Sequence, residues 1–470
     1  MIAPNARRAL AAGALFAVAA CIPRDAGFGS VRNLVRERAN VDVHWRYGEG
    51  MAEPDERVRQ ILSRPISSED AVQVALLNNA ELQAAFEEIG VARAVLAGST
   101  LPSNPEVEGH IGFVQDGERP DLGFEATENL TALLFLPLRR GAADSELEAA
   151  RVRAAGSSLE LAFTARTAFY DYQAAEQIRE LQTTVFDATA ASWELAQRLH
   201  EAGNITDLDF ANERAFYEEA RMAVANAEVA ALHRREILNR LMGLSGADTS
   251  WRAAGRLPDP TEQLPPIADL ERRAIERSLD LRELETRFAA AARRGNVARA
   301  ESLLPELRAG VRAEREEGPW EIGPVVSLAL PLFEQGQTGV GVAEAEMRRI
   351  RGLYTARAIR VRSEVRAVRD QLVTLGRTVA HYQDVLLPLR EHIVQESLRQ
   401  YNAMQLGAFQ LIAAKQAEVQ TGRDYVGVLR NYWRARATLD QLLAGRLASA
   451  ADADLDIART GAVPIERGAH

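Results

Sequence analysis

The chain has 470 residues, a formal net charge of −10 and 47% hydrophobic residues. Alanine and arginine are abundant, whereas only 6% of the residues are aromatic and lysine occurs once, as Lys415. This composition favours long helices over sheets, and the acidic balance argues against binding of nucleic acid through its phosphates. The single cysteine, Cys21, excludes an intramolecular disulfide and any metal site built from several cysteines.

Residues 1–21 have the pattern of a bacterial export signal. Two arginines precede an apolar stretch, which is too short to span a membrane and ends at Val18-Ala19-Ala20-Cys21. That ending resembles a lipobox, so we expect Cys21 to carry a covalent lipid; the alternative is a buried amphipathic helix. Because Ile22 and not an aspartate follows the cysteine, the analogy with bacterial lipoproteins indicates the outer membrane.

The most regular pattern in the chain is an apolar seam. Its members follow one another in alternating steps of four and three residues, which is the spacing of a helix that packs along one edge. They are Val361, Val365, Val368, Leu372, Leu375, Val379, Tyr382, Leu386, Leu389 and Ile393. The pattern predicts one continuous helix between about Gly341 and Ala403, roughly 90 Å long. Such a helix belongs either to an exposed coiled-coil stalk or to a larger helical assembly.

In chain order, the first half predicts a tether, a helix, a β-hairpin and two long helices. The approximate spans are 22–65 for the tether, 67–97 for the helix, 107–113 and 122–136 for the strands, and 141–202 and 206–242 for the long helices. The first helix would be capped by Ser67 or Ser68, and Asp116-Gly117 is the predicted hairpin turn. Apolar and polar residues alternate in the strands, whereas apolar residues recur at helical spacing elsewhere.

The same order recurs in the second half. After a proline-rich linker, the approximate spans are 267–300 for the helix, 305–314 and 322–330 for the strands, and 336–406 and 408–444 for the long helices. Three matches between the halves lie roughly 200 residues apart: Leu101-Pro102 with Leu304-Pro305, Leu136-Pro137-Leu138 with Leu330-Pro331-Leu332, and Gly203 with Gly407. An internal duplication of this kind determines the architecture.

These patterns divide the chain into six segments. They are a signal peptide with lipobox at 1–21, an N-terminal tether at 22–65, a first structural repeat at 66–245, a linker at 246–266, a second structural repeat at 267–445 and a disordered tail at 446–470.

The four predicted strands lead us to expect a closed barrel. A four-stranded sheet has open edges, and lipid tolerates only closed barrels, in which every backbone group is paired. Three copies of the chain would supply about twelve strands, within the range of outer-membrane barrels. The alternative is a small soluble β-domain. The expected lipid-facing residues are Val107, Ile111, Phe113, Val311, Val326 and Leu328, and the expected lumen-facing residues include Glu106, Glu108, Arg312 and Glu314.

Over about residues 66–445, the sequence resembles the TolC-type outer-membrane efflux proteins. Beside the lipobox and the duplicated halves, the stretch from Arg198 to Leu208 is similar to the helix-tip motif of that family, in which a glycine follows an arginine by five residues. Tyr401 to Phe409 resembles the tip of the second half. The resemblance implies a mainly α fold with a small membrane β-barrel. Duplicated halves, each a helix, a β-hairpin and a long helical hairpin, would form a homotrimeric α/β-barrel tunnel.

The same resemblance implies passive export and no enzymatic activity. A periplasmic adaptor, the membrane fusion protein, would join the duct to an inner-membrane pump by docking at the helix tips, around Arg198, Gly203, Tyr401 and Gly407. The protein would sit in the bacterial outer membrane, anchored by the lipid on Cys21, and extend into the periplasm without a cofactor. Ducts of this family leave the choice of substrate to the pump.

Acidic residues near the tips differ from the pattern of the family. Some members carry aspartates just after the second tip, which close the tunnel as an acidic ring, but residues 410–416 contain none. Acids occur at the first tip, as Asp207 and Asp209. If these side chains face inward, three chains would form a narrow, cation-favouring constriction. The alternative is that they cap the return helix, where the helix dipole favours a carboxylate.

We expect neither a catalytic nor a metal site. The glycines between Gly336 and Gly341 follow a strand, but their spacing is wrong for a dinucleotide-binding loop and the helix after them is too long for a compact βαβ unit. The seven histidines show no ligand spacing. Two other functions stay open, a lipid-anchored periplasmic coiled-coil scaffold and an adaptor without a pore. A scaffold would lack the alternating strands, and an adaptor would have one helical hairpin rather than two.

Overall fold

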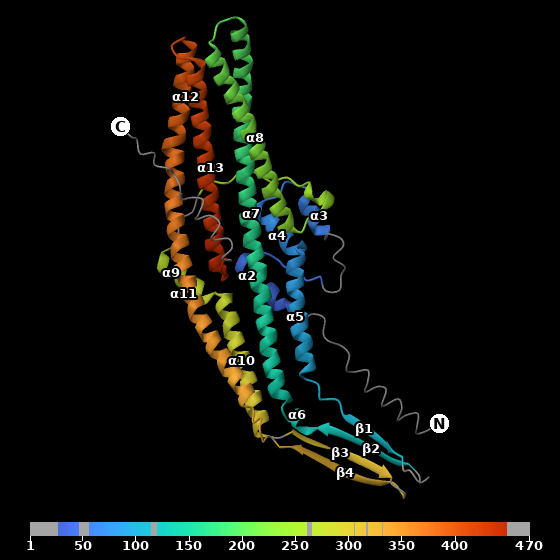
Figure 1. The fold of residues 1–470 in the computed structure, drawn as a ribbon. Helices are drawn as coiled ribbons and strands as arrows, with labels where there is room; N and C mark the ends of the chain where they lie inside the picture. The colour runs from blue at the N-terminus through green and yellow to red at the C-terminus, as the bar shows by residue number, and fades with distance from the viewer. Residues whose placement is uncertain are drawn as a thin grey trace. The chain divides into compact units, whose positions relative to one another are not determined.

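The computed structural model describes residues 27–46, 56–113, 120–260, 266–304, 306–315, 318–330 and 332–448 (Figure 1). The predicted signal peptide with Cys21, the turn at Asp116-Gly117 and the predicted tail beyond residue 448 lie outside the described residues. The same holds for Pro305 and Pro331, which contribute to the match between the two repeats.

The predicted duplication is confirmed, since each half holds two shorter helices, a β-hairpin and two long helices. In the first half these are α4 (Ser68–Asn78), α5 (Ala80–Gly98), β1 (Glu106–Gly112), β2 (Asp121–Asn129), α7 (Leu136–Glu201) and α8 (Asp207–Met242). In the second half they are α9 (Ile267–Glu276), α10 (Leu279–Leu303), β3 (Glu306–Arg315), β4 (Glu321–Ala329), a first long helix and α13 (Ala408–Ala444). The first long helix of this half has three parts, which are α11 (Gln337–His381), the π-helical turn η2 (Tyr382–Leu386) and α12 (Leu387–Asn402). The shorter elements are α2 (Phe28–Ala39), α3 (Glu56–Leu62), α6 (Leu130–Leu134) and η1 (Gly246–Thr249). Within the described ranges, none of the helices combines the length and the apolar character needed to cross a bilayer.

The chain forms two compact units, and each unit draws segments from both halves. The sheet unit consists of Met1–Val31, Ala84–Ala155 and Leu279–Arg357. The tip unit consists of Arg32–Gln83, Gly156–Ser278 and Ala358–His470. A sequence repeat and a compact unit are thus different divisions of this chain, because α7 and α11 contribute residues to both units.

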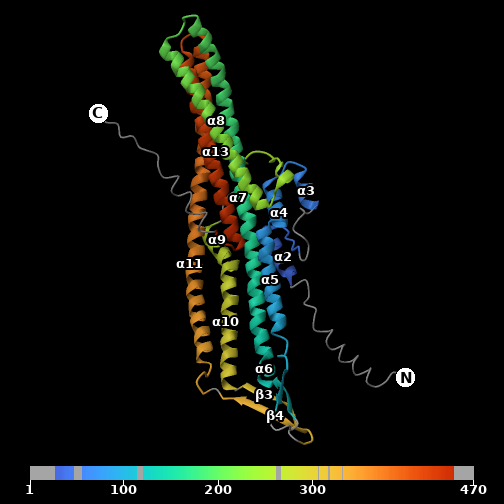
Figure 2. The same cartoon turned by 45° about the vertical axis from the view of Figure 1, so that its right-hand side comes forward.

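In the sheet unit, four antiparallel strands lie in the order β1-β2-β3-β4 (Figure 1). Figure 2 shows the hairpin of β3 and β4 from a second direction. The central pairing of β2 with β3, which places Glu125 opposite Arg312, joins the hairpin of the first half to that of the second. The amide of Leu307 in β3 donates a hydrogen bond to the hydroxyl of Thr131 in α6 at 2.9 Å, so the short helix is fixed to the end of the sheet.

Two boundaries after β2 differ from the prediction of a strand that reaches Leu136. The strand ends at Asn129, whose side chain accepts a hydrogen bond from the amide of Ala132 at 2.8 Å and thereby caps α6. Helix α7 begins at Leu136 rather than at Gly141. Pro137 fits there, because the first turn of a helix does not need its missing amide hydrogen.

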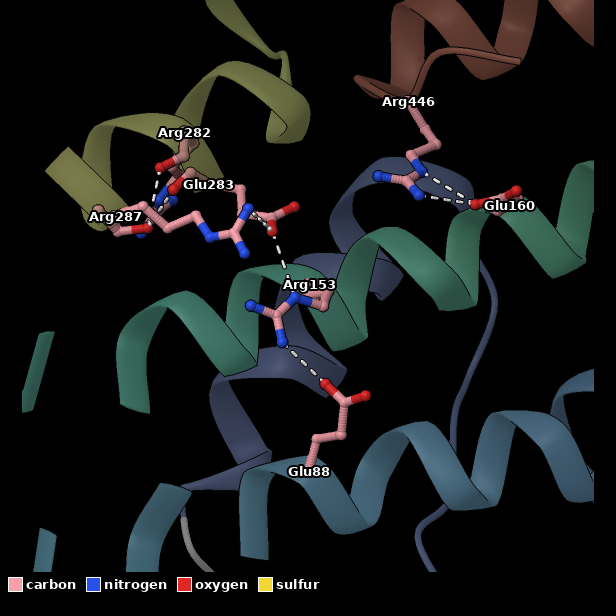
Figure 3. A network of polar contacts seen from close by, with 8 residues as sticks. Glu88, Arg153, Glu160, Arg282, Glu283, Arg287 and Arg446 are labelled. Carbon is pink, nitrogen blue, oxygen red and sulfur yellow. Dashed lines mark hydrogen bonds and ion pairs between the residues drawn. The ribbon is translucent and has the colours of Figure 1, made fainter. Parts of the chain in front are cut away.

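Arginines bridge carboxylates on neighbouring helices of the sheet unit. Arg153 of α7 donates to Glu88 of α5 at 2.8 Å and to Glu283 of α10 at 3.2 Å (Figure 3). The Arg153 side chain is 38% exposed, so each pair contributes at most about 1 kcal/mol. A buried apolar cluster of α10 and α11, made of Leu284, Ala291 and Ile350, contributes more, because burying one such large side chain is worth about 1.5–3 kcal/mol.

The helices predicted over 67–97 and 267–300 are each broken in two. In the first, Asn79 has an extended backbone (φ −70°, ψ 121°), and its side chain accepts a hydrogen bond from the buried amide of Leu82 at 2.9 Å. Asn79 therefore ends α4 and caps α5. In the second, the break falls between Glu276 and Leu279. Of the two predicted N-caps of α4, Ser67 and Ser68, the structure has Ser67.

The ends of α8 and α13 pack against these two breaks in the tip unit. They terminate at Gly243 and Gly445, both with a left-handed backbone, at φ values of +66° and +100°. A β-carbon on Gly243 would lie 2.5 Å from the carbonyl oxygen of Asn78, and one on Gly445 would lie 1.9 Å from that of Arg277. Glycine is required at both places for its backbone conformation and for the close approach of another segment.

The described part of the predicted tether, residues 27–46 and 56–65, is not irregular as the sequence predicts, since α2 and α3 lie in it. In the tip unit, Asp42 accepts hydrogen bonds from Arg32 at 2.7 Å and from Arg36 at 2.9 Å, and Trp45 is 7% exposed. The helical pattern of α2 depends on only four large apolar residues, Phe28, Val31, Leu34 and Val35, among polar and charged ones, which makes it easy to miss.

The predicted linker holds the long helices of the tip unit together. We call residues 251–259 the belt. Trp251 at its start is only 2% exposed. Gln173 of α7 donates to a carbonyl group of the belt at 3.1 Å, and the indole of Trp433 in α13 donates to another at 2.7 Å. The belt therefore contacts long helices from both halves of the chain.

The predicted apolar seam is confirmed as far as Val379. Exposed fractions along it are 2% for Val361, 0% for Val365, 1% for Leu372 and 1% for Val379. The first two residues share a buried cluster with Leu270 and Ala274 of α9, Leu442 of α13 and Leu447, so part of the segment predicted as a disordered tail is packed. Beyond Val379 the helix is not continuous as predicted, because the π-helical turn η2 separates α11 from α12.

We predict that Gly243→Ala lowers the free energy of unfolding by roughly 2–4 kcal/mol, because an overlap with Asn78 adds to the cost of a left-handed alanine. Thermal unfolding of the purified protein measures the loss. Gly246→Ala is the matched control: its φ is +58° and nothing lies within 4 Å of its β-carbon. That variant should lose only about 1 kcal/mol. Equal losses in both variants would show that the contact with Asn78 is unimportant.

A second prediction concerns acid. The hydrogen bond from Arg32, with help from Arg36, lowers the pKa of the Asp42 carboxyl from 3.8 to about 2. Because the pKa is lowered in the folded state, ionised Asp42 stabilises the fold above about pH 4, and this contribution disappears as the pH falls toward about 2. We expect Asp42→Asn to unfold at a lower temperature than the wild type at pH 7, and the difference to shrink between these two pH values. A difference that does not change with pH would contradict the assignment.

Candidate functional site

The sheet has one mainly apolar face, with the charged residues Glu128 and Arg315 near its two ends, and one charged face. Alternate residues of a strand point to opposite sides, and the register places the residues predicted to face lipid on one side. Their exposed fractions are 72% for Val107, 60% for Ile111, 54% for Val311, 67% for Val326 and 51% for Leu328; Phe113, just after β1, is 85% exposed. The apolar face is thus open to the surroundings of this chain, and contiguous exposed apolar residues mark binding or membrane surfaces.

The opposite face of the sheet is charged and mainly acidic. Arg312 donates to Glu125 from two nitrogens, at 2.8 and 3.0 Å, and Arg308 pairs with Glu106 and Glu306. By register, the acidic residues on this face are Glu106, Glu108, Asp121, Glu125, Glu306, Glu314 and Glu321. The four residues predicted to face a lumen therefore share one side, and that side suits contact with water.

At the first tip, the predicted glycine stop is confirmed. Gly203 has a left-handed backbone with φ +69°, and its amide and that of Asn204 donate to carbonyl groups in the last turn of α7 at 2.9 and 2.8 Å. These two hydrogen bonds form a Schellman turn. The guanidinium of Arg198 is exposed and pairs with Glu194 at 2.5 Å.

At the second tip, Gly407 is not the left-handed residue. Met404 takes that conformation with φ +57°, and its amide and that of Gln405 both donate to carbonyl groups of α12, among them that of Tyr401, at 2.9 Å. Gly407 is extended (φ −79°, ψ 160°) and caps α13, with its amide donating to the side chain of Gln410 at 2.9 Å.

The predicted match between Gly203 and Gly407 is therefore wrong. Met404 occupies the place of Gly203, and Gly407 occupies that of Thr206, the N-cap of α8. The arginine gives the correct register, because Arg198 precedes Gly203, and Arg399 precedes Met404, by the same number of residues.

The two aspartates of the first tip have different surroundings. The carboxylate of Asp209 accepts a hydrogen bond from the hydroxyl of Thr206 at 2.8 Å, while its amide donates to the same hydroxyl at 3.1 Å. The side chain of Asp207 is 99% exposed, and its nearest ionisable partner is His200 at 3.8 Å. Both lie in the first turn of α8, where the helix dipole favours a negative charge. The capping interaction therefore belongs to Asp209, whereas Asp207 projects into solvent.

A row of aromatic rings, absent from the predicted site residues, joins α7 to α8 behind the first tip. Phe210 stacks on His200 with ring centroids 4.2 Å apart and lies 4.8 Å from Trp193, while Phe186 lies 5.6 Å from Tyr217. Ring pairs of this kind add about 0.5–1.5 kcal/mol each. The sequence signals this row by its spacing: the three rings of α7 follow one another at intervals of seven residues, and the two rings of α8 are also seven residues apart.

No protein-family model matches the chain, and no curated protein matches its sequence. Its structure, in contrast, matches 23 solved chains. The CmeC outer membrane channel of Campylobacter jejuni superimposes with a TM-score of 0.69 at 15% identity, covering 83% of this chain and 88% of that chain. The chain has the fold of the TolC-type outer-membrane channels.

Two further structures agree. The MtrE outer membrane channel of Neisseria gonorrhoeae, in its open state, matches with a TM-score of 0.66 at 16% identity over 81% of this chain and 89% of that chain. A membrane protein from Pseudomonas aeruginosa matches with a TM-score of 0.68 at 18% identity over 84% and 91%. The resemblance predicted from the sequence is thus confirmed at the level of the fold.

The second tip yields a prediction, because Met404 holds a backbone conformation that glycine adopts more easily. We expect Met404→Gly to stabilise the hairpin by about 0.5–1 kcal/mol and to slow amide hydrogen exchange in the last turn of α12. Gln405→Gly is the matched control; this neighbour has no positive φ, so the change should destabilise the turn. If both variants destabilise equally, the left-handed assignment of Met404 is incorrect.

Proposed function

We propose that this protein is the outer-membrane channel of a tripartite efflux system and acts as a passive export duct without enzymatic activity. The observation that carries the proposal is the sheet, whose apolar face is exposed on all four strands while its other face is charged. Such a surface suits lipid on one side and water on the other. The fold supports the proposal, since CmeC and MtrE are outer membrane channels.

The proposed assembly is a homotrimer. Within one chain β1 and β4 are edge strands, and an open edge cannot stay unpaired in lipid. Three chains would close about twelve strands into one barrel. An exposed apolar stripe on α8 supports packing between copies: Met222, Val229 and Leu232 are 60%, 67% and 62% exposed and lie at heptad spacing.

The proposal includes an anchor and two partners. A covalent lipid on Cys21 would hold the protein to the outer membrane, which the lipobox-like sequence supports. A periplasmic adaptor would dock at the two tips, around Arg198, Gly203, Tyr401 and Gly407, and connect the duct to an inner-membrane pump. The exposed turns at the ends of the long hairpins support this docking site, since they offer backbone and side chains that no part of the described tip unit covers.

Asp207 and Asp209 are the proposed constriction of the duct. The exposure of Asp207 supports this role, whereas the capping hydrogen bonds of Asp209 reduce its share. Three copies would bring these carboxylates near one axis, and a ring of carboxylates favours cations.

Conductance of the full-length protein in a planar bilayer, measured together with its oligomer size in detergent, tests the proposal. We expect a trimer with stepwise channel currents, and a weaker cation preference in Asp207→Asn. A folded protein without conductance would instead be a lipid-anchored scaffold or an adaptor. Unchanged ion preference in Asp207→Asn, with channel currents present, would remove Asp207 from the constriction and leave the duct intact.

The two faces of β4 provide a matched pair of substitutions. Val326 points to the apolar face and Ser327 to the charged face. If the apolar face lies in lipid, Val326→Arg should cost about 2–4 kcal/mol of stability near the middle of the membrane, whereas Ser327→Arg should cost much less. Unfolding in urea from lipid vesicles measures both. Similar costs for the two variants would contradict the membrane assignment of the sheet.

A further inference from the structure

The apolar seam changes position at the π-helical turn in the second hairpin of the tip unit. The seam residues from Val361 to Val379 are buried or half-buried, but Leu389 and Ile393, which continue the same spacing, are 49% and 36% exposed. Half-buried positions of α12 with heptad spacing are instead Leu387, Arg390, Val394, Ser397 and Tyr401. Each of these lies one residue after the position that the seam predicts, and Glu396 is the one half-buried residue of α12 that stays on the predicted seam. Most of the face of α12 that packs inward is therefore displaced by one residue.

The π-helical turn η2 accounts for this displacement. The amide of Leu387 donates to the carbonyl group of Tyr382, five residues earlier instead of four. Such a turn accommodates one extra residue, and one residue corresponds to a rotation of about 100° around the helix axis. Pro388 favours the turn, because in a regular α-helix it could not bond to the carbonyl group of Asp384 and its ring would clash with that group.

Side chains of the tip unit hold the π-helical turn in place. Gln383 donates to Asp259 of the belt at 2.7 Å and to the hydroxyl of Tyr425 in α13 at 3.0 Å. The Tyr425 hydroxyl in turn donates to Asp259 at 2.9 Å. Burial of this hydroxyl, together with the neighbouring Asp259, raises the pKa of Tyr425 to about 12, so it keeps its proton at neutral pH.

The first hairpin has no such turn, although the halves are duplicated. Helix α7 is unbroken, and Gln182, Thr189 and Ala196 are buried at an uninterrupted spacing of seven residues. Asp187 stands in α7 at the place that Pro388 has in the second half, when the halves are aligned on Gly203 and Met404. The extra residue is therefore a property of the second hairpin alone.

The two possible inward faces of α12 are similarly apolar. The face seen in the structure presents Leu387 and Val394 but also the charged Arg390, whereas a straight helix would present Leu389 and Ile393. We propose that the second hairpin has two registers: in one the π-helical turn is present, and in the other the helix is regular and α12 is rotated so that Leu389 and Ile393 pack against α13. Formation and loss of the turn would rotate the second tip relative to the belt. This switch does not depend on the proposed export function.

Cysteine labelling of the full-length protein, assembled in detergent, tests the switch. Ile393→Cys and Val394→Cys report the two faces through their rates of reaction with a maleimide, and the parent chain gives the background from Cys21. Each is placed in three backgrounds. The wild type can form both registers. Deletion of Asp384 together with Pro388→Ala removes both the extra residue and the proline that would clash in a regular helix. It fixes the face seen in the structure, because a regular helix that is one residue shorter turns Val394 inward. Pro388→Ala removes the proline that opposes a regular helix. A regular helix from which no residue is deleted turns Ile393 inward.

We expect the ratio of the labelling rate at 393 to that at 394 to be highest in the deletion background and severalfold lower in Pro388→Ala, with the wild type between them. The same ratio in all three backgrounds would show that α12 has a single register and overturn the proposal. Protection of both positions in every background would also overturn it, because the exposed face would then be covered by a second copy of the chain. If the deletion does not assemble, the comparison of Pro388→Ala with the wild type decides alone.

Discussion

A very long helix must be positioned by a narrow strip of side chains along one edge, and this constraint shapes the molecule. Each buried valine or leucine of the seam contributes about 1.5–3 kcal/mol, whereas an exposed ion pair contributes at most about 1 kcal/mol. The seam from Val361 to Val379 therefore fixes where α11 lies in the tip unit. Ion pairs such as that between Arg366 and Glu271 add selectivity for one register without supplying most of the stability.

The ends of the return helices α8 and α13 are held by similar backbone contacts, although the side chains around them differ. In the first half, the end of α8 packs on the backbone of Asn78; in the second, the end of α13 packs on the backbone of Arg277. The side chains at the two breaks differ, but both contacts involve a carbonyl group and a left-handed glycine. Each contact requires a glycine on one side only, because the backbone carbonyl group on the other side is present whatever the side chain there.

Periodicity and local motifs determined which features could be predicted. The strands, the seam and Gly203 follow from alternation, heptad spacing and a helix stop, and all of them were identifiable in the sequence. The breaks at Asn79 and before Leu279 were not, because they depend on the packing of a helix end that comes more than 160 residues later. Helix α2 is missed because its apolar pattern is too short.

At the tips, the glycine of the second half suggests the wrong match. The left-handed residue there is a methionine, whose turn is held by backbone hydrogen bonds to α12. The hydroxyl of Thr206 shows that Asp209 takes part in capping α8, which is one of the two predicted roles, and the constriction stays a prediction.

The belt has a consequence for how the chain unfolds. Repeat proteins whose units contact only their neighbours can lose one unit at a time. Here the segment between the repeats makes hydrogen bonds to α7 of the first half and to η2 and α13 of the second. Opening either half of the tip unit breaks contacts that the other half shares. A duplicated chain of this kind should therefore melt as one cooperative unit rather than as two independent repeats.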